Sequence, residues 1–216
     1  MRKDFFGESR ETIIPRILKE NGLTKGVEIG VFKGAFSSHL VKNWGGKIWM
    51  IDPWRALDDT EVYVDMSNHK NHETAYLESM RSIEGFEDRA FMLRGLSDQL
   101  CDLFGYGSID FAYVDGNHAY NFVKQDIEIW WEKIKPGGFL MGHDYLAMDD
   151  WYESEFIEGG KDKHIWLKGS DPDSEYQYAG IFGVNTAVDE FAEKNDLRIG
   201  ITSEWLGSWI IQKPDR

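Results

Sequence analysis

Short apolar runs that alternate with helical patterns constrain the fold of this 216-residue chain more than any other feature. The runs cover residues 26–31 (GVEIGV), 47–52 (KIWMID), 90–93 (AFML), 109–115 (IDFAYVD) and 139–144 (FLMGHD). Between them lie helical patterns at residues 35–44, 72–83, 97–104 and 119–134. Strands alternating with helices are typical of βαβ units and a parallel sheet. We therefore predict an α/β fold of the Rossmann-like, doubly wound kind.

The later part of the chain completes this prediction. Residues 119–134 carry Phe122, Asp126, Ile129 and Trp130 at helical spacing and stop at the KPGG of residues 135–138. A further helix is expected at residues 186–194, followed by strands at 198–202 and 208–212. The short link between these two strands contains Gly207, which favours an antiparallel hairpin at the sheet edge. The expected sheet is mostly parallel and seven-stranded, in one domain spanning residues 1–216.

Two stretches lack a regular pattern, at about residues 55–71 and 145–180, and we expect them to be lid or substrate loops. Five aromatic residues lie in or beside them: Trp54, Trp151, Tyr152, Tyr176 and Tyr178. They could serve as platforms for a sugar, or they could simply anchor long loops on the core. The aromatic residues Trp130, Trp131 and Trp205 are expected to be packing residues.

Charge and composition exclude several partners. The chain has 24 Lys and Arg against 38 Asp and Glu, a formal net charge of −14, which argues against binding nucleic acid or an anionic membrane surface. No apolar run approaches the roughly 20 residues of a membrane span. The single cysteine, Cys101, fits a reducing compartment, and the charged N-terminus lacks the apolar segment of a secretory signal. We expect a soluble cytoplasmic protein; its oligomeric state is left open.

The distinctive polar residues fall where the predicted strands end, and ligands of parallel α/β sheets bind beyond those ends. The first group is Glu28, Gly30 and Gly34. Glycine lets the backbone approach a ligand closely, but Phe32 occupies the second glycine position of a dinucleotide-binding turn. This turn suits an uncharged or zwitterionic ligand, or it is a tight turn without a ligand.

Two further strand ends carry candidate cofactor contacts. Asp52 lies 22 residues beyond Gly30, where an acidic residue commonly binds a ribose diol. The alternative is that it caps the turn before Pro53. Ser97 is expected to be the N-cap of the following helix, with contact to a nucleobase as a second interpretation.

The richest group lies at the last two parallel strand ends, in the sequences DGNH (115–118) and GHDY (142–145). Asp115, His143 and Asp144 offer two carboxylates and an imidazole, which suit Mg²⁺ or Mn²⁺. His118, three residues after Asp115, could face the same pocket as a base. The alternative is that these residues are helix caps and turn residues.

Together these residues resemble class I S-adenosylmethionine-dependent methyltransferases. The stretch FAYVDGNHAYNFVKQDIEIWWEKIKPGGFLMGHDY is similar to small-molecule O-methyltransferases that include macrolide-sugar methyltransferases and cephalosporin-hydroxylase-like proteins. The resemblance covers roughly residues 26–145 and the C-terminal hairpin. The sugar methyltransferases generally carry an acidic residue where this chain has His143.

The resemblance implies roles for individual residues. Glu28, Gly30 and Gly34 would line the methionine and ribose end of the cofactor, Asp52 would hold the ribose hydroxyls, and Ser97 would lie near the adenine. Asp115 would lie beside the cofactor and, with Asp144, hold a metal ion, while His118 would be the general base.

The resulting hypothesis is a metal-assisted O-methyltransferase that uses S-adenosylmethionine and a sugar or other small hydroxylated acceptor. Two alternatives stay open at this point. One is a nicotinamide-dependent oxidoreductase, which shares the sheet and Asp52 but usually has the missing glycine motif. The other is a non-catalytic cofactor-binding domain, since fold alone does not fix function.

Overall fold

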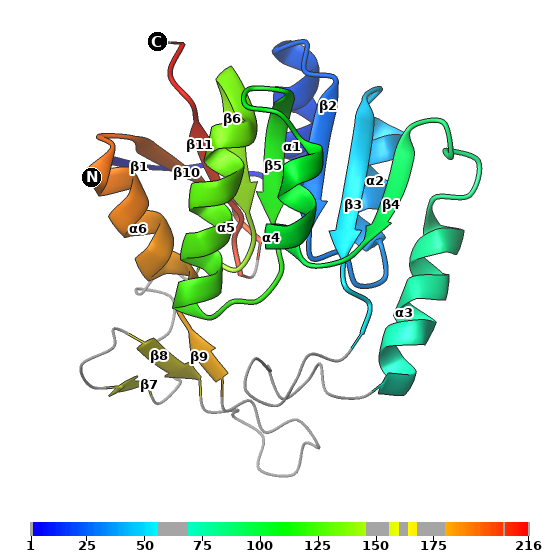
Figure 1. Cartoon of the computed structure of the whole chain (residues 1–216). Coiled ribbons are helices and arrows are strands. Elements are labelled where there is room, and N and C mark those ends of the chain that lie inside the picture. Colours follow the sequence, from blue (N-terminus) through cyan, green and yellow to red (C-terminus); the bar gives the residue numbers. More distant parts are fainter. Residues whose placement is uncertain are drawn as a thin grey trace.

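A single large sheet organises the chain, shown in Figure 1 as a computed structural model. The structure describes residues 2–55, 69–145, 156–159, 164–167, 180–204 and 206–215. The strands of the large sheet are β1 (Arg2–Phe5), β2 (Lys25–Ile29), β3 (Lys47–Asp52), β4 (Ala90–Arg94), β5 (Ile109–Val114), β6 (Ile134–Gly142), β10 (Arg198–Ile201) and β11 (Trp209–Gln212). They are ordered β1-β10-β11-β6-β5-β2-β3-β4.

The strand directions confirm the predicted class. Strands β4, β3, β2, β5 and β6 run parallel, whereas β11 is antiparallel to both β6 and β10, forming the expected C-terminal hairpin. The sheet has eight strands rather than the expected seven because β1 adds to the outer edge, parallel to β10. This N-terminal strand was missed because its sequence, RKDF, shows no alternation of apolar and polar residues.

Helices cover both faces of the sheet, as a doubly wound fold requires. Helices α1 (Arg10–Glu20), α2 (Ala35–Asn43) and α3 (His69–Ser82) pack on one side. On the other side lie α4 (Ser97–Leu100), the 3-10 turn η2 (Cys101–Leu103), α5 (Tyr120–Lys133) and α6 (Val184–Lys194). In Figure 1, α4, α5 and α6 stand in front of the sheet and α1 and α2 behind it.

Each face of the sheet has its own apolar core, because alternate side chains of a strand point to opposite faces. Val27 and Ile29 belong to the core that α5 and α6 cover, whereas Met50 and Tyr113 belong to the core under α1 and α2. Strand β5 is buried along its whole length, as expected for a run covered on both faces.

Two local predictions around α5 need correction. The helix ends at Lys133, just before the KPGG sequence as predicted, but β6 begins at Ile134 rather than at residue 139, so the KPGG sequence lies inside a strand. A register irregularity between β5 and β6 at Ile109 and Phe111 accommodates this start. The buried face of α5 is formed by Val123, Asp126, Ile127 and Trp130, whereas Phe122, one of the four residues at the predicted helical spacing, is 36% exposed.

The second predicted loop contains regular structure. Strands β7 (Phe156–Gly159), β8 (His164–Leu167) and β9 (Gly180–Phe182) form a small antiparallel sheet. The rest of both loops lies outside the described residues, as do the aromatic residues Trp151, Tyr152, Tyr176, Tyr178 and Trp205. In the described part of the chain, no helix combines the length and apolarity that crossing a membrane requires.

Candidate active site

The carboxyl ends of the parallel strands gather at the lower edge of the sheet in Figure 1, on the side of β7–β9. The backbone is unusual at this edge. Phe32, Trp54 and Asp144, which follow β2, β3 and β6, all have positive φ angles, of 50°, 39° and 58°. Side chains other than glycine rarely adopt this conformation, and such residues concentrate at functional sites.

Four polar side chains meet beyond the ends of β5 and β6. His118 Nε2 lies 2.8 Å from Asp144 Oδ2 and 3.7 Å from Asp115 Oδ1. His143 Nδ1 lies 3.2 Å from Asp144 Oδ1 and 3.8 Å from Asp115 Oδ1. The two histidines therefore stand between the same two carboxylates, and the predicted convergence of these four residues is present.

The electrostatics of this group favour charged forms. Burial alone would lower the pKa of His118, but its hydrogen bonds to Asp115 and Asp144 outweigh burial and raise that pKa to about 10. Burial would raise the pKa of Asp144, yet hydrogen bonds from His118 and His143 hold it well below its usual range. At neutral pH His118 is consequently an imidazolium paired with a carboxylate.

An additional residue, Arg10, completes the cluster, and sequence reasoning missed it. Arg10, the first residue of α1, donates from Nη1 to the Tyr113 hydroxyl at 2.9 Å and lies 3.3 Å from Asp115 Oδ2. Tyr113 and Ser208 share a further hydrogen bond of 2.8 Å. Arg10 is 105 residues away from Asp115 in sequence, in a segment with no recognisable motif.

The glycine turn after β2 is shaped by close packing. Gly30 has a φ of 83°, and a side chain there would collide with the backbone oxygen of Asp115. Gly34 has a φ of 75° and faces Ser79 and Ser82 of α3. Gly30 thus brings β2 against the loop after β5, whereas Gly34 lets α3 pack against the start of α2.

Glu28 and Asp52 are both buried at this edge, and both already have hydrogen-bond donors. The Ser37 hydroxyl donates to Glu28, whose pKa is raised well above its usual value by burial and by the carboxylates of Asp115 and Asp52. Asp52 accepts backbone N–H groups at 2.7–2.9 Å, from residues 31 and 32 through Oδ2 and from residue 54 through Oδ1. Asp52 therefore has the turn role that we considered as its alternative, with lone pairs left for further donors.

The structure corrects the expected role of Ser97. The N-cap of α4 is Leu96, without a side-chain cap, and Ser97 is the first residue of the helix. Its hydroxyl accepts the Trp130 indole N–H at 2.7 Å and is hydrogen-bonded to Asp126. The Ser97 side chain is thus held in place by hydrogen bonds to two residues of α5.

The described aromatic residues Trp54, Trp130 and Trp131 pack in the protein interior or against other aromatic rings. Trp54 is 1% exposed, its indole N–H donates to the Phe32 carbonyl at 2.7 Å, and its ring meets Tyr76 edge-on. Trp130 is fully buried, and Trp131 packs against Phe191.

The donor set at the cluster fits a divalent cation. Ligand atoms of Asp115, His118 and Asp144 all lie within 4.8 Å of one another. Two carboxylates and an imidazole suit Mg²⁺ or Mn²⁺. This set differs from the predicted one, Asp115, His143 and Asp144, because His118 takes the place of His143.

The Rossmann-like sheet with a polar cluster at its carboxyl edge is typical of the doubly wound proteins that bind ligands beyond their strand ends. A family model described as a methyltransferase domain matches residues 27–145, more than half of the chain. The protein belongs to this methyltransferase-domain family, which confirms the predicted membership of the class I S-adenosylmethionine-dependent methyltransferases. The match favours this class over a nicotinamide-dependent oxidoreductase. No curated protein matches the chain.

Solved structures share the fold at low sequence identity. The O-methyltransferase TomG from Streptomyces achromogenes, involved in tomaymycin synthesis and solved with S-adenosylmethionine, has a TM-score of 0.62 and 13% identity over 95% of this chain and 79% of its own. The S-adenosylhomocysteine-bound methyltransferase PaMTH1 from Podospora anserina has a TM-score of 0.61 and 14% identity over 95% and 78%. A Bacillus cereus O-methyltransferase in complex with S-adenosylhomocysteine has a TM-score of 0.57 and 14% identity over 94% and 79%.

Proposed function

We propose that the protein transfers the methyl group of S-adenosylmethionine to a hydroxyl oxygen of a small hydroxylated molecule, such as a sugar. The observation that carries this proposal is the convergence of Asp115, His118, His143 and Asp144 beyond the ends of β5 and β6. Solved relatives in fold that hold S-adenosylmethionine or S-adenosylhomocysteine, among them O-methyltransferases, support the cofactor and the oxygen acceptor.

The cofactor would lie along the strand ends that carry the glycine turn. In this proposal Glu28, Gly30 and Gly34 line its methionine and ribose end, Asp52 accepts the ribose hydroxyls, and Asp115 lies beside the transferred methyl group. Ser97 lies near the adenine; because its hydroxyl already accepts from Trp130 and is bonded to Asp126, its backbone N–H is the better donor to the base.

Methyl transfer asks little covalent chemistry of the protein, because the sulfonium already activates the methyl group. The enzyme must align the acceptor oxygen with the C–S bond and exclude water. His118 would take the hydroxyl proton during attack. At neutral pH its acid form dominates in this structure, so the base role requires that this proton first leave the cluster.

With His118 as the base, Asp115, His143 and Asp144 would hold Mg²⁺ or Mn²⁺, because an imidazole that coordinates the ion has no lone pair left to take a proton. When bound, such an ion supplies positive charge that replaces the proton between the carboxylates and lowers the pKa of a coordinated acceptor hydroxyl. The ion-pair distances of 3.7 and 3.8 Å around Asp115 are consistent with a carboxylate that can still accept a ligand.

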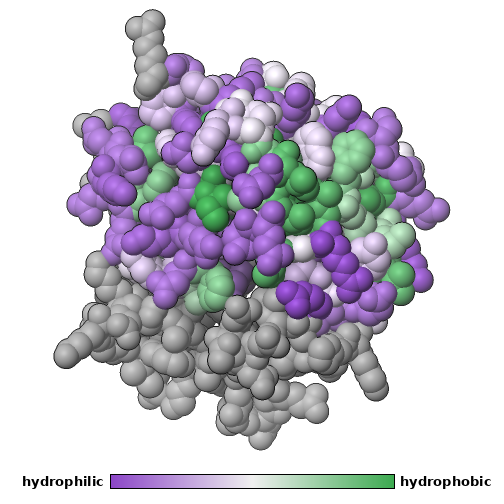
Figure 2. Space-filling view, viewed as in Figure 1, coloured by the Kyte–Doolittle hydropathy of each residue, from purple (hydrophilic) through white to green (hydrophobic). Residues whose placement is uncertain are grey.

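The whole chain, residues 1–216, would act as one methyltransferase domain, with the stretches 55–71 and 145–180 as lids over the acceptor. The carboxylate-rich surroundings favour a neutral or cationic acceptor. Figure 2 shows a largely hydrophilic surface over α5 and α6. The net charge of −14 supports the proposal that nucleic acid and anionic membranes are not partners. The single cysteine supports a cytoplasmic location.

Calorimetry tests the cofactor first. The full chain is titrated with S-adenosylmethionine, S-adenosylhomocysteine and NAD, each with and without Mg²⁺. We expect binding of the two adenosyl compounds and none of NAD; the reverse pattern would overturn the proposal.

The reaction is then tested by measuring S-adenosylhomocysteine release across a panel of sugars, catechols and amines. We expect release with a hydroxylated acceptor, its loss in EDTA, and its return with Mg²⁺ or Mn²⁺. Full turnover in EDTA would remove the metal ion from the proposal, and turnover with amines alone would remove the oxygen acceptor.

A further inference from the structure

The N-terminal arm, residues 2–10, runs along the outer edge of the sheet as β1 and ends near the carboxyl ends of the parallel strands. Strand β1 pairs with β10 from Arg2↔Arg198 to Phe5↔Ile201, and the Phe6 N–H donates to the Ile201 carbonyl at 2.7 Å. The backbone N–H of Arg10 donates to Glu204 Oε2 at 3.0 Å. Because β1 is parallel to β10, this arm delivers the start of α1 to the edge where the cofactor turn lies.

The guanidinium of Arg10 is held there on several sides. Its side chain is 19% exposed and contacts Tyr113 and Asp115 through Nη1 and Glu11 through Nε at 3.2 Å. It also stacks over the ring of Phe36 at 4.9 Å. Phe36 belongs to the first turn of α2, directly after the glycine turn.

One part of this guanidinium still has donors to offer. In the regions that the structure describes, no acceptor is found for Nη2 of Arg10. Arginine has five N–H donors in a planar fork suited to carboxylates. The N–H groups of Nη2 are therefore available to a ligand that offers an acceptor.

The charges around Arg10 limit which chemical group of a ligand it can bind. Arg10 lies among carboxylates, since Asp115 is in contact with it and the charge of Arg10 acts on Glu28. Three other basic side chains near this edge differ from Arg10: Lys33 lies 3.2 Å from Glu78, Arg94 pairs with Glu73 at 3.5 Å, and Arg55, which follows β3, is exposed. A methyl donor brings a sulfonium, an ammonium and a carboxylate. The two positive groups suit the carboxylate of Asp115, whereas the negative carboxylate of the donor needs a cation to leave water.

We propose that Arg10 binds the α-carboxylate of the methyl donor, so that the N-terminal arm completes the cofactor site. The carboxylate would accept from Nη2 while Nη1 keeps its contact with Asp115. One residue then ties the cofactor's amino-acid end to a carboxylate of the cluster. This inference rests on the proposed use of S-adenosylmethionine.

The test is a binding cycle that needs no acceptor. Wild type and Arg10→Met are titrated by calorimetry with S-adenosylmethionine and with decarboxylated S-adenosylmethionine. We expect Arg10→Met to weaken binding of S-adenosylmethionine about 10- to 100-fold, the loss of one charge-assisted contact, and binding of the decarboxylated compound about threefold or less. Equal losses for both compounds, or no loss for either, would overturn the proposal.

Two further variants keep the test decisive. Arg10→Lys keeps the charge without the fork, and we expect an intermediate loss that is again confined to S-adenosylmethionine; equal losses for both compounds would contradict the proposal even if Arg10→Met does not fold. Arg16→Met, on the exposed side of the same helix, removes an ion pair with Glu8 and should leave both affinities unchanged. If wild type binds neither compound, the proposed function itself fails; if wild type binds and only the selectivity is absent, the role of Arg10 alone fails.

Discussion

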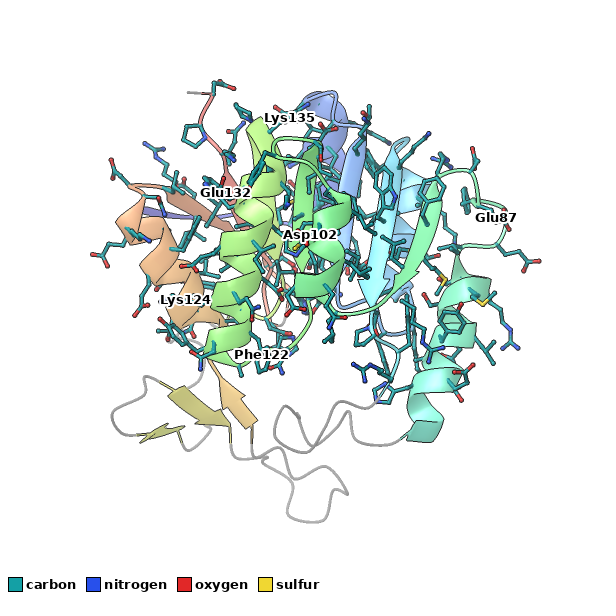
Figure 3. All side chains as sticks on the ribbon, viewed as in Figure 1. Glu87, Asp102, Phe122, Lys124, Glu132 and Lys135 are labelled. Carbon is teal, nitrogen blue, oxygen red and sulfur yellow. The ribbon has the colours of Figure 1, made fainter. Side chains whose placement is uncertain are left out.

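Asp110 and Asp115 lie at opposite ends of the buried strand β5, and their surroundings differ. Asp110 accepts the backbone N–H groups of Thr24 and Lys25 through Oδ2, and its Oδ1 lies 2.7 Å from Lys135 Nζ. Figure 3 shows Lys135 at the top of the sheet, away from the candidate active site. Burial would raise the pKa of Asp110, but the bonds from Lys135 and the two N–H groups lower it.

Asp115 has longer contacts and more neighbours that carry charge. Arg10, His118 and His143 surround it at 3.3, 3.7 and 3.8 Å, and its side chain is 20% exposed against 9% for Asp110. A carboxylate with short bonds on both oxygens is a structural clamp, whereas one with long contacts can still accept a ligand. The comparison teaches that the same residue type can serve the fold at one end of a strand and, as we propose for Asp115, chemistry at the other.

The largest expected effect tests the end of β5 that carries Asp115 and the polar cluster, called here the chemical end. His118→Ala should lower turnover by about 10²- to 10⁴-fold while leaving S-adenosylmethionine affinity nearly intact, because it removes the proposed base but no proposed cofactor contact. Turnover is measured with the acceptor found in the panel above. His39→Ala, on the exposed surface of α2, is the matched control and should be silent. Wild-type turnover in His118→Ala would exclude the base role.

The next largest effect concerns the close approach of Gly30, after β2, to the Asp115 backbone, after β5. Gly30→Ala should lower the free energy of unfolding by about 2–5 kcal/mol, because it adds a strained positive φ and a collision with the Asp115 backbone. Gly45→Ala is the control, since a side chain there meets nothing within 4 Å. Urea unfolding of both variants measures the difference; equal stabilities would contradict the described approach of β2 to the β5 loop.

Asp126 offers a third case, a buried carboxyl beside a hydroxyl. Burial raises its pKa to about 7, with Ser97 opposing and Asp98 adding to the shift. A raised carboxyl pKa means that the folded state binds the proton more tightly, so its stabilising effect is complete below about pH 4 and is lost as pH rises through about 7.

The comparison of wild type with Asp126→Asn isolates this effect. Between about pH 5 and about pH 8, wild type should lose roughly 2–3 kcal/mol of unfolding free energy that the variant keeps. Urea unfolding at both pH values measures it. Parallel pH profiles for the two proteins would show that Asp126 stays ionised in the fold.

The smallest expected effects compare the two ends of β5 directly. Asp110→Asn leaves one acceptor for three donors and should cost about 1–3 kcal/mol of stability, with S-adenosylmethionine affinity unchanged. Asp115→Asn should cost less than about 1 kcal/mol, because its contacts are long and partly exposed, yet it should weaken turnover. The distinction between clamp and chemical end would be wrong if Asp115→Asn lost more stability than Asp110→Asn.

Much of the fold follows from local pattern. The five apolar runs became β2 to β6, because a strand covered on both faces must be apolar along its length, as residues 109–114 are. The β5 and β6 ends also placed Asp115, His118, His143 and Asp144 together, since parallel strands share one carboxyl edge. Local pattern failed at the KPGG sequence, which lies within β6 between the pairs Ile109↔Ile134 and Phe111↔Phe139, where the register with β5 shifts.

The sequence by itself determined the class of fold and the strand ends that carry the candidate active site, because periodicity and the alternation of strands with helices along the chain are properties of neighbouring residues. Only the tertiary structure decided which side chains complete that site. Arg10 meets Asp115 because β1 pairs with β10 and fixes the start of α1 at the carboxyl edge. A contact between residues so distant in sequence depends on the pairing of two edge strands, and nothing in the local sequence around Arg10 records that pairing.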